Sequence, residues 1–406
     1  MKKLLSVVLA LLMLAVMLPV TAMAEDTNYC TIAGLTDESG ELKHFDTLTA
    51  AAKAWRESKQ IVTEGPTLGG HPAELTEESI VWNIYGTVPS GDGAGVIGTS
   101  GSILSGGYIY PSITIKSVTV NGNNNATITK TGTEPKAPYV GCSANSVEFT
   151  NITFADSMRN EGDPGSSTFT NCTFKADLRM PHNRENATLK VENCTFTGEV
   201  ASDYAIFVQG PRGGTMRNVV LSGNKISGYQ RGVNVQAGTG ATVSITGNTI
   251  TNLTGYTKND QTYGAAIQLT TGREFIITNN KIDVNTGNAF RFYSGLDADV
   301  TISDNIIKAP YLVWNQAELP NEKITSQDNK LTITNPNKAA TSDGALEDAT
   351  VIKAAPTQIV IITPAGDTPK TEPEKNPTTG ANDMVAAAAA LMAVSALGMA
   401  VLSRKK

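Results

Sequence analysis

A six-residue phrase recurs along the middle of this chain and constrains its fold more than any other feature. It consists of an apolar residue, a variable residue, Asn, Gly or Asp, a small or polar residue, another variable residue and finally Phe, Ile or Leu. The copies are FTNITF (149–154), FTNCTF (169–174), VENCTF (191–196), LSGNKI (221–226), ITGNTI (245–250), ITNNKI (277–282), ISDNII (302–307) and a weaker SQDNKL (326–331). Their last residues are 20, 22, 30, 24, 32, 25 and 24 positions apart, in the range of solenoid repeats. The uneven spacing predicts insertions in one loop around a fixed core.

The residues that precede each phrase indicate strands. Apolar residues stand two positions apart, as in Val147 and Phe149 or Val243 and Ile245, and a period of two is typical of a strand. No helical periodicity of useful length lies between the strands, so strand is expected to stack on strand in coils. The sequence therefore predicts an all-β fold, a right-handed parallel β-helix over residues 111–335, with coils about 4.8 Å apart.

In-register stacking places one turn position of every coil in a single column. The expected column consists of Ile152, Cys172, Cys194, Asn224, Asn248, Asn280, Asn305 and Asn329. Stacked asparagines hydrogen-bond to one another and to the turn backbone, as they do in cross-β structures. We therefore expect a structural ladder, with a row of polar ligands as the alternative.

The composition limits the remaining possibilities. A chain of 406 residues with a formal net charge of −6 allows one elongated domain plus accessory segments, and nothing in it favours a nucleic-acid partner. Four cysteines are too few for a disulfide framework in so long a chain. Cys172 and Cys194 are expected to be small buried residues, although adjacent coils also permit a disulfide, and Cys30 and Cys142 are a second candidate pair.

The N-terminal segment resembles a secretory signal peptide. Residues 1–24 contain two lysines, a long apolar run and the small-residue site Ala22-Met23-Ala24. This resemblance implies a secreted chain that begins near Glu25.

The C-terminal segment, residues 376–406, resembles a Gram-positive cell-wall sorting signal. The motif Asn376-Pro377-Thr378-Thr379-Gly380 is followed by an apolar stretch, 384–402, and by Arg404-Lys405-Lys406. The apolar stretch is long enough to span a bilayer as a helix, and the terminal cations favour the cytoplasmic side. A plain C-terminal membrane helix behind a chance NPTTG is the alternative.

The resemblance to sortase substrates implies the partners and the location of the protein. In those substrates the cysteine of a sortase attacks the motif threonine and transfers the chain to a peptidoglycan amine. Thr379 would then become the new C-terminus, covalently attached to the cell wall, and residues 384–402 would hold the chain in the membrane only transiently. The usual motif begins with Leu-Pro, so Asn376 leaves the class of sortase open.

The segments on either side of the repeats are predicted to form an N-terminal cap, a closing strand and a spacer. Residues 25–110 are expected to form an N-terminal cap with a helix over 46–59, for which Asp46 is the expected N-cap, and a strand over 79–88. A helix that leads into a strand before SITIKSVTVNGNNNATITK (112–130) resembles the entry of pectate-lyase-like β-helix proteins. The resemblance covers about residues 45–335 and includes no active-site signature. Residues 336–375 are expected to hold a closing strand, PTQIVIIT (356–363), and a Pro/Thr-rich spacer.

The strands that follow the long insertions offer the candidate binding face. Inward alternation assigns Ile206, Val208, Val233, Val235, Ile267, Leu269, Phe290 and Phe292 to the core. The outward columns are then Phe207, Asn234, Gln268 and Arg291 beside Gln209, Gln236, Thr270 and Tyr293. Amides, an arginine and a tyrosine suit the hydroxyls and ring faces of a sugar chain. The predicted glycan-binding residues are Asn234, Gln236, Gln268, Arg291 and Tyr293, and a merely solvated face is the alternative.

Catalysis is the second hypothesis. Polysaccharide-cleaving enzymes need paired carboxylates, or a base near calcium-binding acids, and acids occur here only in flanking loops. They are Asp177, Glu185, Asp203, Asp260, Asp297 and Asp299. We therefore predict no catalytic, metal or cofactor residues and expect a wall-anchored surface protein that binds polysaccharide or host glycan or acts as an adhesin. The alternative is a secreted, wall-bound lyase or glycoside hydrolase.

Overall fold

The structure is a computed structural model, and the residues that it describes are mostly β, with one short α-helix. It describes residues 27–58, 74–91, 113–130, 144–159, 165–180, 185–200, 202–210, 214–258, 261–336, 338–340, 346–348 and 359–360. The chain divides into two compact units, Met1–Ile362 and Thr363–Lys406. The second unit, which includes the predicted sorting signal, and the predicted signal peptide lie outside the described residues.

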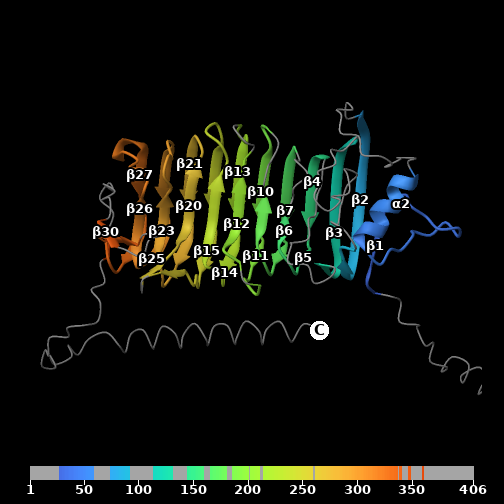
Figure 1. The fold of residues 1–406 in the computed structure, drawn as a ribbon, viewed down its shortest axis with the longest axis horizontal. Helices are drawn as coiled ribbons and strands as arrows, with labels where there is room; N and C mark the ends of the chain where they lie inside the picture. The colour runs from blue at the N-terminus through green and yellow to red at the C-terminus, as the bar shows by residue number, and fades with distance from the viewer. Residues whose placement is uncertain are drawn as a thin grey trace, which may run out of the picture. The chain divides into compact units, whose positions relative to one another are not determined.

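Each of the first seven repeats forms one coil of three strands, the eighth contributes two, and successive coils stack in parallel (Figure 1). The strands before the turn are β4 (Ala144–Thr150), β7 (Ser166–Thr170), β10 (Thr188–Glu192), β13 (Asn218–Ser222), β16 (Thr242–Thr246), β21 (Glu274–Thr278), β24 (Asp299–Ser303) and β27 (Ile324–Gln327). Those after the turn are β5 (Thr153–Phe154), β8 (Thr173–Phe174), β11 (Thr195–Phe196), β14 (Lys225–Ser227), β17 (Thr249–Thr251), β22 (Lys281–Asp283), β25 (Ile306–Ala309) and β28 (Lys330–Ile333). The predicted stacked coils are confirmed.

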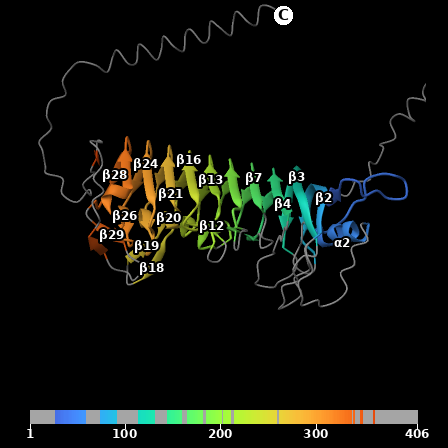
Figure 2. The ribbon, with the colours of Figure 1, turned by 90° about the horizontal axis from the view of Figure 1, so that it is seen from above.

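The remaining strand of each three-stranded coil belongs to a separate parallel sheet, here called the third sheet. It consists of β6 (Met158–Arg159), β9 (Leu178–Met180), β12 (Tyr204–Gln209), β15 (Arg231–Gln236), β20 (Ala265–Thr271), β23 (Asn288–Phe292) and β26 (Tyr311–Asn315). Figure 2 shows β12, β20 and β26 along one side of the stack, opposite β7, β13 and β16. The predicted binding face is the outer surface of this sheet.

The turn between the first two strands explains the restricted third position of the repeat. The residue there has a positive φ in every described coil from β4 to β28, for example 59° at Asn151, 67° at Gly247 and 58° at Asp304. This left-handed conformation costs most residues about 1–2 kcal/mol, whereas Gly, Asn and Asp adopt it readily. The phrase therefore permits only these three residue types.

The asparagine ladder is confirmed in atomic detail. Asn248 Nδ2 donates to Asn280 Oδ1 (3.0 Å) and to the carbonyl oxygen of Leu221 (2.9 Å), while Asn280 Oδ1 also accepts from the Asn248 backbone N–H (2.9 Å). The same arrangement links Asn224 to Asn248 at one end and Asn305 to Asn329 at the other. Every amide in the column is buried, so the ladder satisfies backbone groups that no water reaches.

Neither candidate disulfide forms. Cys30, Cys172 and Cys194 are buried free thiols, and Cys142 lies outside the described residues. Cys172 Sγ lies 3.6 Å from the carbonyl oxygen of Phe149, and Cys194 Sγ lies 3.5 Å from that of Phe169. In this orientation the two thiols continue the column of small buried side chains.

The core lies inside the coils and is built from matching side chains. The eight residues assigned to the core by alternation are at most 1% exposed. Near the first coils, phenylalanines stack on phenylalanines, with ring centroids 5.0 Å apart for Phe149 and Phe169 and 4.6 Å apart for Phe174 and Phe196. Like side chains therefore occupy like positions in successive coils, as the repeat predicts.

An N-terminal cap precedes the coils. β1 (Tyr29–Ile32) pairs antiparallel with β2 (Glu74–Pro89), and β2 continues in parallel with β3 (Ile113–Thr129). Helix α2 (Leu48–Ser58) buries Leu48 and Trp55 against the hydrophobic core. The helix and strand were predicted, but the N-cap was wrong: Thr47 Oγ1, and not Asp46, accepts a hydrogen bond from the Ala50 backbone N–H (3.1 Å).

At the other end the chain closes with short strands. β31 (Ile359–Val360) pairs in parallel with β28, which confirms a strand within the predicted segment 356–363. Two antiparallel hairpins, β18 (Tyr256–Lys258) with β19 (Gln261–Tyr263) and β29 (Lys338–Ala340) with β30 (Leu346–Asp348), and a 3-10 turn, η1 (Asn321–Lys323), complete the described elements. Asn288 Nδ2 donates to the carbonyl oxygen of Ala340 (2.8 Å) and so joins β23 to the second hairpin.

Candidate functional site

One column of outward side chains crosses all the strands of the third sheet. The register aligns Arg159, Arg179, Phe207, Asn234, Gln268, Arg291 and Trp314 on successive strands from β6 to β26. The predicted run from Phe207 to Arg291 is confirmed. Trp314 was missed, although YLVWNQ (311–316) follows a repeat phrase as the other face strands do and alternates in the same way.

The prediction for the second outward column, Gln209, Gln236, Thr270 and Tyr293, was wrong at one residue. Gln209 pairs with Gln236 as expected, but Gln236 pairs with Thr271 and not with Thr270, because β20 contains an irregularity at this point. An extra residue in one strand leaves a side chain without a partner position on the next. Thr270 turns toward Asn234 instead and donates a hydrogen bond from Oγ1 to Asn234 Oδ1 (2.9 Å).

Polar side chains of this face form a buried, hydrogen-bonded network and not the open surface that the sequence suggested. Asn234, Gln268 and Arg291 are only 6, 4 and 7% exposed, whereas Tyr293 is 37% exposed and Gln236 is half-buried. Long side chains on adjacent strands shield one another when they bond across the 4.7–4.9 Å strand spacing. Three of the five predicted residues therefore belong to the outer face of the sheet and yet are almost fully buried.

The network runs across the strands through Gln268. Gln268 Nε2 donates to Thr270 Oγ1 (3.3 Å). Gln268 Oε1 accepts from the hydroxyl of Tyr204 (3.1 Å) and from the guanidinium Nη1 of Arg291 (3.3 Å). Arg291 Nη2 in turn donates to Gln316 Oε1 (2.9 Å), and Gln316 lies exposed at the surface. We call Asn234, Gln268, Thr270 and Arg291 the sheet-face cluster. Neither Tyr204 nor Gln316 was singled out from the sequence.

Aromatic rings flank the sheet-face cluster. The guanidinium carbon of Arg291 lies 4.1 Å from the ring centre of Trp314 and 4.8 Å from that of Tyr293. Tyr204 lies beside Phe207 (6.0 Å between ring centres) and under the guanidinium of Arg231 (4.0 Å). Such cation–π contacts fix the arginines in place. The Tyr293 side chain remains exposed on the outer face, whereas Trp314 is buried.

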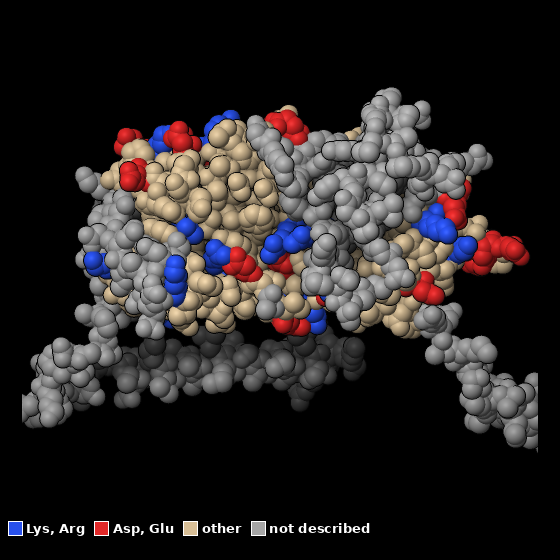
Figure 3. Space-filling view, viewed as in Figure 1, with Lys and Arg blue, Asp and Glu red and all other residues tan. Residues whose placement is uncertain are grey.

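Two other arginines of the third sheet are paired with acids. Arg179 forms an ion pair with the buried Asp177, and Arg231 forms one with Asp203 through both Nε and Nη2. Figure 3 shows cationic and acidic side chains next to each other across the middle of the face seen in Figure 1. Of the loop acids considered for catalysis, Asp177 and Asp203 are thus engaged in structural pairs, and Asp260 lies outside the described residues.

Burial sets the electrostatics of the site. It lowers the pKa of Arg291, and the neighbouring Arg231 lowers it further. Burial also opposes the charge of Arg231, but the hydrogen bond to Asp203 and the electrostatic attraction of Tyr204 and Asp203 together outweigh burial and raise its pKa. Burial raises the pKa of the Tyr204 phenol. Around neutral pH the site therefore presents two cations and neutral hydroxyl groups.

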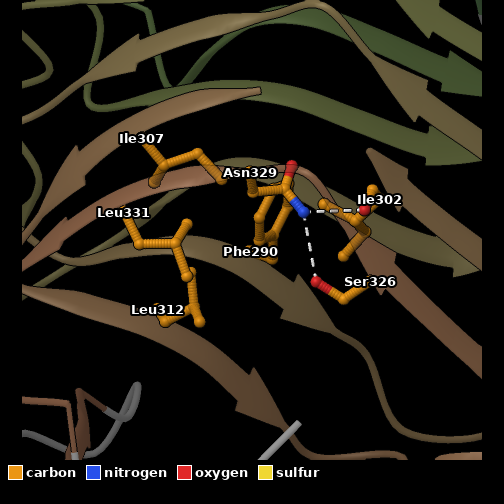
Figure 4. A pocket seen from close by; sticks show the side chains of 7 residues that line it. All are labelled: Phe290, Ile302, Ile307, Leu312, Ser326, Asn329 and Leu331. Atoms are coloured by element: carbon orange, nitrogen blue, oxygen red, sulfur yellow. Dashed lines mark hydrogen bonds between the residues drawn. The ribbon is translucent and has the colours of Figure 1, made fainter. Parts of the chain in front are cut away.

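A small cavity inside the last coils is not a second candidate site. Its walls are Phe290, Ile302, Ile307, Leu312, Ser326, Asn329 and Leu331, and its volume is about 10 Å³ (Figure 4). Asn329, the one amide there, already donates to Ile302 O (2.8 Å) and Ser326 Oγ (3.1 Å). A space of this size holds one water at most. The described residues also include no group of three or more His, Cys, Asp or Glu side chains placed to hold a metal ion.

Comparison with known proteins supports the architecture. A family described as right-handed β-helix region matches residues 163–335, which span the coils from the loop before β7 to the end of β28. No curated protein matches the sequence. No solved structure matches it either. The match therefore identifies a β-helix region and assigns no ligand or reaction.

The described part of the chain contains no helix that is both long enough and apolar enough to cross a bilayer. The predicted membrane segment, residues 384–402, falls outside that part.

Proposed function

We propose that this chain is a cell-wall-anchored surface protein of a Gram-positive bacterium whose third sheet binds glycans. The observation that carries the binding half is the sheet-face cluster with its flanking rings. Amide and hydroxyl groups provide both donors and acceptors, and the exposed ring of Tyr293 provides a surface against which the apolar face of a sugar packs.

Some hydrogen-bonding groups of the sheet-face cluster already have partners within the protein, and others are available to a ligand. The Nδ2 of Asn234 makes no hydrogen bond to another described residue, whereas its Oδ1 accepts from Thr270. Tyr293, Gln316 and the half-buried Gln236 lie at the edge of the cluster, where a ligand first meets the protein. A sugar chain that lies across the strands would meet a similar polar position about every 4.8 Å.

Support for the anchoring half comes from the sequence. The motif 376–380, the apolar stretch 384–402 and the terminal cations stand in the order of a sortase sorting signal, and residues 1–24 supply the route of export. Sortase and peptidoglycan are the partners in this proposal, and Thr379 is the residue that forms the covalent link. In this proposal the Pro/Thr-rich segment 363–375 is the spacer that precedes the attachment point in the chain.

Binding is tested with the purified full-length chain on a glycan array. Tyr293→Ala removes an exposed ring from the edge of the cluster and should weaken the best ligand by about three- to tenfold. Tyr85→Ala is the matched control, because Tyr85 is a half-buried tyrosine that stacks on Tyr29 in the N-terminal cap. Binding should survive in the control. An array on which no glycan is retained, or equal losses in both variants, would contradict the proposal.

A further inference from the structure

Arg291 differs from the two arginines of the third sheet whose ion pairs are described above. Arg179 and Arg231 have carboxylate partners, Asp177 and Asp203. Arg291 is 93% buried, yet its contacts among the described residues are two neutral amides, Gln268 and Gln316, and two aromatic rings. A buried cation without a counter-charge is strongly unfavourable in a folded protein. Among the residues that the structure describes, the site is therefore electrostatically incomplete.

The hydrogen-bonding capacity of Arg291 is incomplete as well. A guanidinium has five N–H donors in one plane, and the described contacts use one on Nη1 and one on Nη2. Its Nε is buried and has no hydrogen-bond partner within the described part of the chain. Unpaired buried donors are rare in native proteins because each costs the full desolvation of the group. The fork of the guanidinium thus retains donors for an acceptor that is not part of this network.

The position of that acceptor follows from the partners already present. Gln316 Oε1 accepts from Arg291 Nη2 at 2.9 Å, and the Gln316 side chain is exposed, so a ligand oxygen can replace it without disturbing the core. Tyr293, whose ring lies against the guanidinium, is exposed on the same edge. All of these features favour an anionic oxygen at this edge.

We infer that Arg291 binds the acidic group, carboxylate or sulfate, of an anionic glycan on the third sheet. A carboxylate accepts two parallel hydrogen bonds from a guanidinium, and a sulfate offers the same pair of oxygens. The bound anion supplies the missing counter-charge, and the rings of Tyr293 and Trp314 hold the guanidinium plane in place. This inference rests on the proposed glycan binding and narrows its ligand to acidic sugars.

The test uses matched ligands on the full-length chain. Oligogalacturonate is compared with the same oligosaccharide after methyl esterification, which removes the charge and keeps the sugar. A sulfated glycosaminoglycan fragment and its desulfated form are the second arm and separate sulfate from carboxylate. We expect the charged member of at least one pair to bind about tenfold or more tightly than its neutral counterpart.

Two variants test whether the preference for the charged glycan depends on Arg291. Arg291→Gln removes the charge and keeps an amide that can bond to Gln268, so it should abolish the preference for the charged ligand. Arg217→Gln removes the same charge from an exposed residue that precedes β13, outside the third sheet, and should keep the preference. A preference that survives in Arg291→Gln overturns the inference.

The ligand comparison also stands without the variants, should Arg291→Gln fail to fold. Equal binding of charged and neutral members by the unmodified chain overturns the inference and leaves the proposed glycan binding intact. Binding of neither member of either pair, together with an empty array, overturns both.

Discussion

Single residues of the repeat have roles that depend on their place in the stack. The amide of Asn248 donates to the backbone of Leu221 and to Asn280, and it accepts from both the backbone and the side chain of Asn224. Such a residue satisfies buried groups in two neighbouring coils at once. The sequence alone predicted this role, because identical side chains at identical positions of a stacked repeat must meet.

We predict that Asn248→Leu destabilises the β-helix by about 3 kcal/mol. Leucine has a similar size, but it removes the acceptor of the Asn224 backbone N–H and a donor to the Leu221 carbonyl oxygen, and buried polar groups cost about 1–3 kcal/mol each when unpaired. The measurement is the free energy of unfolding in urea. Asn218→Leu is the control, since Asn218 is exposed at the start of β13, and it should change stability by less than about 0.5 kcal/mol. Equal stabilities of the two variants would argue against the ladder.

At the scale of the element, the repeat predicts which side of a strand each residue occupies. It does not predict irregular pairing or side-chain contacts between neighbouring strands. Alternation correctly assigned the inward residues of the third sheet and most of its outer column. It missed the irregularity of β20, because a single extra residue does not change the apolar pattern. It also missed the burial of Gln268 and Arg291, which arises from hydrogen bonds between side chains of different coils.

A second prediction at this scale concerns Gly247, at the turn between β16 and β17. Gly247 has a φ of 67°, and a Cβ built there meets no atom closer than 3.9 Å. Other coils place Asn or Asp at the same turn position with φ between 53° and 59°. Gly247→Asn should therefore be tolerated within about 0.5 kcal/mol, whereas Gly247→Val, which is β-branched, should cost about 1–2 kcal/mol. Thermal unfolding of both variants distinguishes this conformational effect from crowding, which would destabilise both.

For the whole molecule, the β-helix and the two terminal segments have different proposed roles, one in binding and the other in location. Parallel coils create a surface in which each strand of the third sheet contributes one residue to the outer column, so the breadth of the proposed binding site grows with the number of coils. In the proposal, the two terminal segments determine where this surface is displayed. A wall-linked chain would present the third sheet to extracellular polymers, among them the acidic glycans that we infer pair with Arg291.

The last prediction tests this placement through Thr379 and Gly380. Replacing both with alanine should leave export intact, because residues 1–24 are unchanged. The bond that a sortase would cleave is altered, however, so the chain should remain in the membrane through residues 384–402 at its full mass and be extracted by detergent. The unmodified protein should instead require wall hydrolases for release, because its Thr379 carbonyl would be joined to peptidoglycan. If detergent releases both forms equally, NPTTG is only a spacer and the apolar segment is a permanent anchor.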